Sequence, residues 1–128
     1  MQEHHLFEYA VIRVVPRVER EEFLNVGVIL YCTSRKFLKV RFKLDEERIR
    51  CFSPSIDPAE LLQNLQAFER ISSGDKDSGP IACLDAASRF RWLTAVRSTV
   101  LQTSRVHPGF CKEPDETLEK LYCDLVLY

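Results

Sequence analysis

A chain of 128 residues has the length of one domain, so we expect residues 1–128 to form a single domain with a substantial buried core. An apolar fraction of 45% and a charged fraction of 29% exclude a disordered chain. A formal net charge of −1 excludes a global attraction to nucleic acid or to membrane surfaces, so such binding would require a local patch.

The first third of the chain predicts a set of antiparallel strands. Three apolar stretches have the length and the alternation of strands, and they span residues 9–15, 26–32 and 37–42. The first stretch is interrupted only by Arg13 and ends at Pro16, which has no N–H to donate. The charged residues 17–24 predict either one short helix or a structured loop. Gly27 predicts a bulge or a close backbone approach in the second strand.

The rest of the chain predicts mainly helices. Asp57, followed by Pro58 and Glu60, is a strong helix start, and apolar residues at helical spacing continue this helix to Ile71. Residues 72–79 read as a polar linker bracketed by glycines. In chain order we also expect a short helix at 44–52, a helix within 84–95, a short strand at 99–101, a turn at 107–109 and a last helix that begins at Pro114. This order indicates an α+β fold: a small antiparallel sheet with two or three helices packed mainly on one face.

Five scattered cysteines determine the expected compartment. No two of them form a C-x-x-C pair, so their spacing does not supply a zinc site; they are Cys32, Cys51, Cys83, Cys111 and Cys123. The N-terminal residues MQEHHLF lack the basic and apolar regions of a secretory signal, and the longest apolar run is too short to cross a bilayer. We expect free thiols in a reducing cytoplasm, with no metal, no cofactor and no membrane partner.

Arg13 is the most unusual polar residue of the expected sheet, because Ile12 and Val14 flank it in an apolar strand. A buried guanidinium without a partner is strongly destabilising. Two explanations are open: an ion pair with an acidic side chain such as Glu8 or Glu22, or a clamp that holds a ligand or a partner. Ion pairs are the more common of the two.

A second group of candidate residues lies in the stretch RFRWLTAVRSTVLQTSR. Its arginines are Arg89, Arg91, Arg97 and Arg105, and Ser98 follows Arg97 directly. A planar guanidinium binds phosphate or carboxylate through two hydrogen bonds, and a neighbouring hydroxyl would add a donor. Trp92 would offer a stacking face for a base or a guanidinium. The simpler explanation is a Trp92 packed in the core, with the arginines paired to acidic residues such as Glu19, Glu21 and Glu22.

His107 is the candidate proton carrier, because an imidazole titrates near neutrality. Cys111 stands four residues further along, but Cys–His couples are made in space rather than in sequence. A histidine in a turn before Pro108 is more often a loop hydrogen-bonder. The four glycines, at positions 27, 74, 79 and 109, also match neither the GxGxxG nor the Walker A pattern of a phosphate-binding loop. The sequence therefore does not decide between an enzyme and a binding protein.

Two stretches are distinctive enough to indicate a family. Residues 9–32 read YAVIRVVPRVEREEFLNVGVILYC, and residues 89–121 read RFRWLTAVRSTVLQTSRVHPGFCKEPDETLEKL. Together they resemble an uncharacterised bacterial family, domain of unknown function 3037, and the likeness covers nearly the whole chain. The resemblance implies no assigned activity. Because genes of this family neighbour those of HipA-type kinases, it implies an accessory protein whose partner is a HipA-like kinase.

Three functions are consistent with these observations. The leading expectation is a cytoplasmic module that binds a protein partner, since arginine and aromatic residues are enriched at interfaces and no catalytic set is assembled. The alternative is a phosphate- or nucleic-acid-handling protein, with an enzyme included, that uses Arg13, Arg89, Arg91 and Arg97 as anion clamps and His107 as proton carrier. Convergence of these residues on one cleft would favour the alternative, and their dispersal over different faces would count against it. The third is a homodimer formed through apolar helix faces or an edge strand.

Overall fold

The protein combines one sheet with helices on both of its faces. The computed structural model describes residues 4–95, 97 and 99–127. In chain order, the strands and α-helices of these residues are β1 (His5–Val14), β2 (Leu24–Cys32), β3 (Phe37–Phe42), α1 (Glu46–Phe52), α2 (Pro58–Ser73), α3 (Ala86–Leu93), β4 (Leu101–Thr103), β5 (His107–Cys111) and α4 (Pro114–Leu125). Short 3₁₀ helices lie between them: η1 (Val18–Arg20), η2 (Lys76–Ser78) and η3 (Ile81–Cys83). This content confirms the α+β class.

The sheet is antiparallel, and β1 lies at its centre. The strand order is β3-β2-β1-β4, and β5 also pairs with β1. β1 holds both late strands along one edge, with residues 12–14 paired to β4 and residues 5–9 paired to β5. The pairing of β1 with β2 shifts register after Ile12, and a Cβ at Gly27 would lie 2.9 Å from backbone oxygen of β3. The bulge and the close approach predicted near Gly27 are both present.

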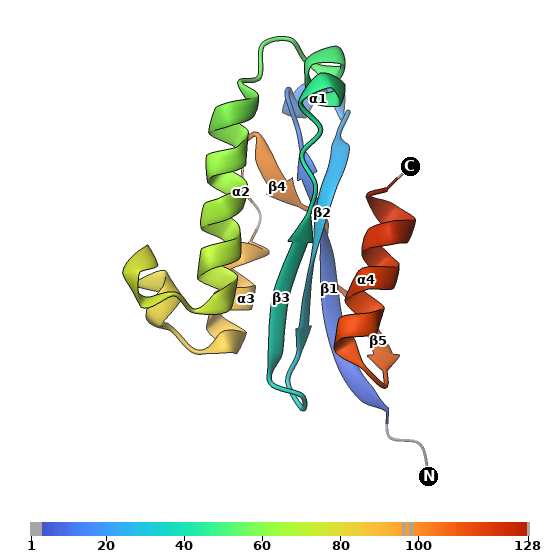
Figure 1. Ribbon diagram of the computed structural model, residues 1–128, viewed down its shortest axis with the longest axis vertical. Coiled ribbons are helices and arrows are strands. Elements are labelled where there is room, and N and C mark those ends of the chain that lie inside the picture. Colours follow the sequence, from blue (N-terminus) through green and yellow to red (C-terminus); the bar gives the residue numbers. More distant parts are fainter. Residues whose placement is uncertain (1–3, 96, 98, 128) are drawn as a thin grey trace.

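The two faces of the sheet carry two separate apolar layers. Successive residues of a strand point to opposite faces, so Ala10 and Ile12 belong to one layer while Phe7 and Tyr9 belong to the other. Residues of α1, α2 and α3 complete the first layer, and residues of α4 complete the second. Figure 1 shows α2 and α4 on the two sides of the sheet. Most of the helices therefore share one face, as predicted.

The ends of α2, the longest helix described, follow from local chemistry. The Asp57 carboxylate accepts a hydrogen bond from the Ala59 amide at 3.0 Å, and Pro58 occupies the first turn, where no N–H is required. Gly74 caps the other end with a φ of 76°, a left-handed conformation that glycine adopts without strain. The helix predicted from Asp57 is confirmed, and it extends slightly beyond its predicted end, to Ser73.

Three segments differ from the sequence prediction. Residues 107–109 open β5 and do not form a turn, because β1 begins earlier than expected, at His5, and gives them a partner strand. Proline and glycine are tolerated there because β5 is an edge strand. Residues 72–79 are not an open linker, since they contain the end of α2, its glycine cap and η2. The late strand lies at 101–103 instead of 99–101.

Candidate functional site

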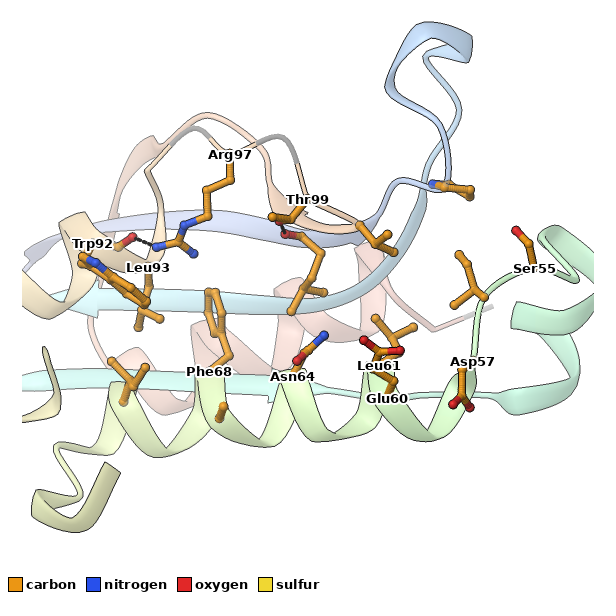
Figure 2. A pocket seen from close by; sticks show the side chains of 16 residues that line it. Ser55, Asp57, Glu60, Leu61, Asn64, Phe68, Trp92, Leu93, Arg97 and Thr99 are labelled. Carbon is orange, nitrogen blue, oxygen red and sulfur yellow. Dashed lines mark hydrogen bonds between the residues drawn. The ribbon is translucent and has the colours of Figure 1, made fainter. Parts of the chain in front are cut away.

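An open groove lies between α2 and the segment that connects α3 to β4. Its volume is about 740 Å³, and it extends from Trp92 at one end to Pro16 and Ser55 at the other. Residues 57 to 71 border it, which corresponds to a length of about 21 Å at the rise of an α-helix. Figure 2 shows side chains of α2 rising toward the groove from one side and those of Arg97 and Thr99 facing them from the other.

The floor of the groove is apolar. Leu61 and Phe68 of α2 and Leu93 of α3 line it, and all three are buried members of the core layer between the helices and the sheet. Ile71 and Leu101 extend the floor as half-buried side chains that pack against the same layer. The groove therefore exposes the margin of the hydrophobic core to solvent, which is the usual construction of a binding site.

Asp57, Glu60 and Asn64 form a polar wall along α2. They are separated by three and four positions, so they share one face of the helix. All three side chains are exposed. Within the described part of the chain, neither carboxylate takes part in an ion pair. The end of the groove near the start of α2 is therefore negatively charged.

Hydrogen bonds hold the opposite wall in place. The Val15 amide of the sheet margin donates to the Val100 carbonyl oxygen at 2.7 Å. The Thr99 hydroxyl donates to the Leu101 carbonyl oxygen, and the Gln102 side-chain amide donates to the Thr99 carbonyl oxygen, both at 2.7 Å. Val100 is left 40% exposed on this wall. The wall is thus an ordered extension of β4 that presents an apolar side chain beside the groove.

Trp92 and Arg97 form the other end of the groove. The Arg97 guanidinium lies 4.2 Å from the centre of the Trp92 ring, and its Nη2 donates to the Trp92 carbonyl oxygen. Burial lowers the pKa of Arg97 from its usual value, but a guanidinium remains charged at neutral pH. No carboxylate pairs with Arg97 among the residues that the structure describes. This end of the groove is therefore positive, and Trp92 is 41% exposed beside it.

Arg13 lies away from the groove, on the face of the sheet that α4 covers. Its neighbours Ile12 and Val14 point toward α2, and its cross-strand partner Asn25 donates to the Leu125 carbonyl oxygen of α4. The expected ion pair with Glu8 or Glu22 is not formed in the described residues, where Glu22 pairs with Arg20. Arg13 instead stacks on an aromatic ring at 4.2 Å, that of Phe23. Arg13 is half-exposed at the end of the sheet, so its charge is accommodated by the contact with Phe23 without a paired carboxylate.

The other predicted arginines of α3 serve local structure. Arg89 donates from Nη1 to the Leu84 carbonyl oxygen at 2.6 Å, and its guanidinium packs over the cap residue Gly74. Arg91 is exposed and lies 3.4 Å from the Ser88 hydroxyl. The expected ion pairs with Glu19, Glu21 and Glu22 are not formed by either arginine in the described residues. Trp92 also lies at the surface rather than in the core.

His107 and Ser98 complete the predicted set. His107 lies on β5, where its ring centre is 5.3 Å from that of Tyr9, its cross-strand partner, which packs in the layer under α4. Ser98 lies outside the described residues. Burial raises the pKa of the Cys111 thiol, which opposes formation of the thiolate that a Cys–His couple requires. Of the predicted candidates that the structure describes, the groove thus contains Arg97, and the others lie elsewhere.

Sequence reasoning missed the wall that α2 contributes. Asp57 and Glu60 were recognised as signals for a helix start, and nothing in their pattern shows whether a neighbouring element covers that face. The strongest available signal was the departure of Trp92 from the apolar stripe of α3, which Phe90 and Leu93 form. An aromatic residue off that stripe is a candidate for an exposed contact.

The described residues define an α+β protein with an open groove that is apolar at its floor and oppositely charged at its ends. Among these residues, no three histidine, cysteine or acidic side chains are grouped as a metal site requires, and no helix has the length and apolar character needed to span a bilayer. The chain belongs to the family described as Protein of unknown function (DUF3037), whose pattern matches residues 9–126. No curated protein and no solved structure matches it. The resemblance found in the sequence is confirmed, and the function has to be inferred from the groove.

Proposed function

We propose that this chain is a protein-binding module of the bacterial cytoplasm and that the groove beside α2 is its docking site. The observation that carries the proposal is the pair of exposed apolar side chains, Trp92 and Val100, above an apolar floor in an open groove. Aromatic and arginine side chains at the centre of an interface supply a large share of binding energy, and Trp92 and Arg97 are such a pair. A partner that covered the groove would remove this surface from water.

The charges of the groove favour a protein over a phosphate or a nucleic acid. The groove contains one guanidinium, that of Arg97 at one end, and two carboxylates, those of Asp57 and Glu60 at the other, and carboxylates repel phosphate. The arginine cluster on which a phosphate-handling protein would depend is also dispersed, since Arg13 and His107 lie on the α4 face of the sheet. The geometry therefore supports recognition of a surface that carries both charges.

Free thiols support a reducing compartment. Cys32 and Cys111 are buried in the layer under α4, and the three exposed thiols belong to Cys51, Cys83 and Cys123. Exposed thiols persist where glutathione and thioredoxin keep them reduced, as in a bacterial cytoplasm. The partner that we propose is a HipA-like kinase, which is what the family resemblance implies.

Co-expression with a HipA-like kinase tests the proposal. We expect a complex that co-elutes in size-exclusion chromatography, and light scattering gives its mass. Asn64→Trp places an indole in the groove at an exposed helix position and should abolish the complex. Gln66→Trp is the matched control, since Gln66 is also exposed on α2 but does not line the groove.

Two results would overturn the proposal. One is the absence of any complex when both proteins are folded. The other is a complex that Asn64→Trp and Gln66→Trp affect equally, because the groove would then not be the docking site. Light scattering of the chain alone distinguishes the homodimer: a dimer that Asn64→Trp dissociates would assign the groove to a second copy of this chain.

A further inference from the structure

We propose that the occupant of the groove is an amphipathic helix of the partner, antiparallel to α2, with an acidic residue near its N-terminus on Arg97 and basic residues near its C-terminus on Asp57 and Glu60. The inference rests on the proposed function, because it specifies what binds in the same groove. Three features of the groove carry it: its place in the helix layer, the face that α2 presents, and the positions of its charges.

The groove occupies a position in the helix layer of the fold. α2 packs on the sheet beside β3, and the groove lies next to it, between α2 and the residues that lead into β4. Figure 2 shows Arg97 and Thr99 across this space from Asn64. The axes of packed helices lie about 8–10 Å apart. A second helix whose axis is aligned with that of α2, in either direction, would therefore complete the layer.

The face of α2 toward the groove has the form of a helix-packing ridge. Its groove residues Asp57, Glu60, Asn64, Ala67 and Ile71 follow one another at intervals of three and four positions. Side chains at this alternating spacing form a stripe along one face of a helix, and such stripes interdigitate where two helices pack together. The small Ala67 in the middle of the row leaves room for a larger apolar side chain of the partner, above the buried Phe68.

The charges determine the direction of the helix. Arg97 uses Nη2 for the Trp92 carbonyl oxygen and stacks one face on the indole, which leaves other N–H donors for a carboxylate. Figure 2 shows Arg97 above Phe68, and Glu60 lies about 12 Å from Phe68 along α2. The partner's acidic and basic residues should therefore stand about seven or eight positions apart. A helix is most stable with acidic residues at its N-terminus and basic ones at its C-terminus, which makes it antiparallel to α2.

A display selection on the purified protein tests this inference without knowledge of the partner. The probe is a phage-displayed library of amphipathic helices of about 16 residues, long enough to cover about 24 Å, with only the charges varied at two groups of positions about seven or eight residues apart, one group toward each end. A second library carries a central proline, which breaks the helix but permits an extended chain. We expect helices with acidic residues in the N-terminal group and basic residues in the C-terminal group to be enriched, and proline-containing sequences to be lost.

Charge reversal identifies the contacts. In the variant Arg97→Glu with Glu60→Lys, helices selected on the native chain should bind at least about tenfold more weakly, and reversal of the charges in the same helices, with their apolar residues unchanged, should restore binding. Arg91→Glu is the matched control, because Arg91 is exposed on α3 but does not line the groove, and it should leave the selected charges unchanged. Asn64→Trp should remove the enrichment, and Gln66→Trp should retain it.

The remaining outcomes show which of the two proposals fails. Enrichment that Asn64→Trp removes, without a charge preference or without reversal, overturns the inference and leaves the proposed function standing. Equal enrichment of proline-containing sequences also overturns the inference, because the groove would then accept an extended chain. Enrichment that Asn64→Trp does not remove places the binding outside the groove and overturns both. No enrichment of any peptide overturns the inference alone, because the complex with the kinase still decides the proposed function.

Discussion

The contact between Gly109 and Phe7 provides a sharp test of how β5 pairs with β1. A Cβ added at Gly109 would lie 2.5 Å from Cζ and 2.8 Å from Cε1 of the Phe7 ring. Carbon atoms in favourable contact are about 3.5–4.0 Å apart, so the ring would have to move by about 1 Å. Phe7 is buried in the layer under α4, where little space is available for such a movement.

Gly109→Ala should therefore destabilise the protein. Overpacking of this kind costs about 1–3 kcal/mol, and the lower conformational entropy of the unfolded alanine chain recovers about 0.4–1 kcal/mol. A net loss of about 1–2 kcal/mol corresponds to a decrease in Tm of about 4–8 °C for a domain of this size. Thermal and urea unfolding, followed by circular dichroism, give both quantities.

A double-mutant cycle shows whether the ring is the cause. In a Phe7→Leu background, Gly109→Ala should cost less than about 0.5 kcal/mol, because the smaller side chain leaves room for the new methyl group. Phe110→Leu is the control background: Phe110 is a neighbouring aromatic residue on β5 that is largely exposed, and it should give no relief. If Gly109→Ala is neutral in the native background, residues 107–109 form the turn that the sequence predicted, and the β1–β5 register is wrong.

Three further predictions concern the groove, the thiols and the surface of α4. Trp92 is the single tryptophan of the chain, so its fluorescence reports on one end of the groove. Arg97→Ala removes the guanidinium that stacks on the ring, so the emission should shift to the red and quenching by acrylamide should increase. Arg91→Ala is the control and should change neither. Iodoacetamide at mildly alkaline pH should modify the three exposed thiols at least tenfold faster than the two buried ones, Cys32 and Cys111. Mass spectrometry of the native protein measures these rates; the exposed thiols are those of Cys51, Cys83 and Cys123. Equal rates would contradict the burial of the layer under α4. A hydrogen bond from Arg41 lowers the pKa of Glu119, so this carboxylate stabilises the folded state above its unfolded pKa and loses that effect as the pH falls through its folded pKa. Glu119→Gln should therefore lower stability slightly at neutral pH and match the native chain at acid pH; a difference that persists at acid pH in urea unfolding would refute the assignment.

Local signals in the sequence were sufficient for the elements that depend on local chemistry. The cap at Asp57 with Pro58 located the start of α2, and the alternating stretch at 37–42 matched β3. Residues 107–109 were misassigned because proline and glycine occur both in turns and on edge strands, and the choice depends on a partner strand about 100 residues away along the chain. Long-range pairing of this kind leaves no local mark in the sequence.

The candidate site was less predictable than the fold. Arg13 was singled out as unusual, but its partner is the ring of Phe23 and not a carboxylate, and it lies on the face of the sheet that α4 covers. Trp92 was recognised as a stacking face for a base or a guanidinium, and the guanidinium of Arg97 stacks on it. The groove itself escaped prediction because a binding surface on α2 depends on which neighbouring positions in the helix layer are empty, and residue types do not encode an absence.

The position of β1 between early and late strands affects how this protein is made on the ribosome. β2 and β3 can pair with β1 soon after they are synthesised, but its other edge, which β4 and β5 complete, waits for residues 101–111. During that interval the nascent chain presents an unpaired strand edge, the form of backbone that most readily joins a neighbouring chain. Slow decoding between α2 and β4 would lengthen this exposure, and the yield of native protein should fall accordingly.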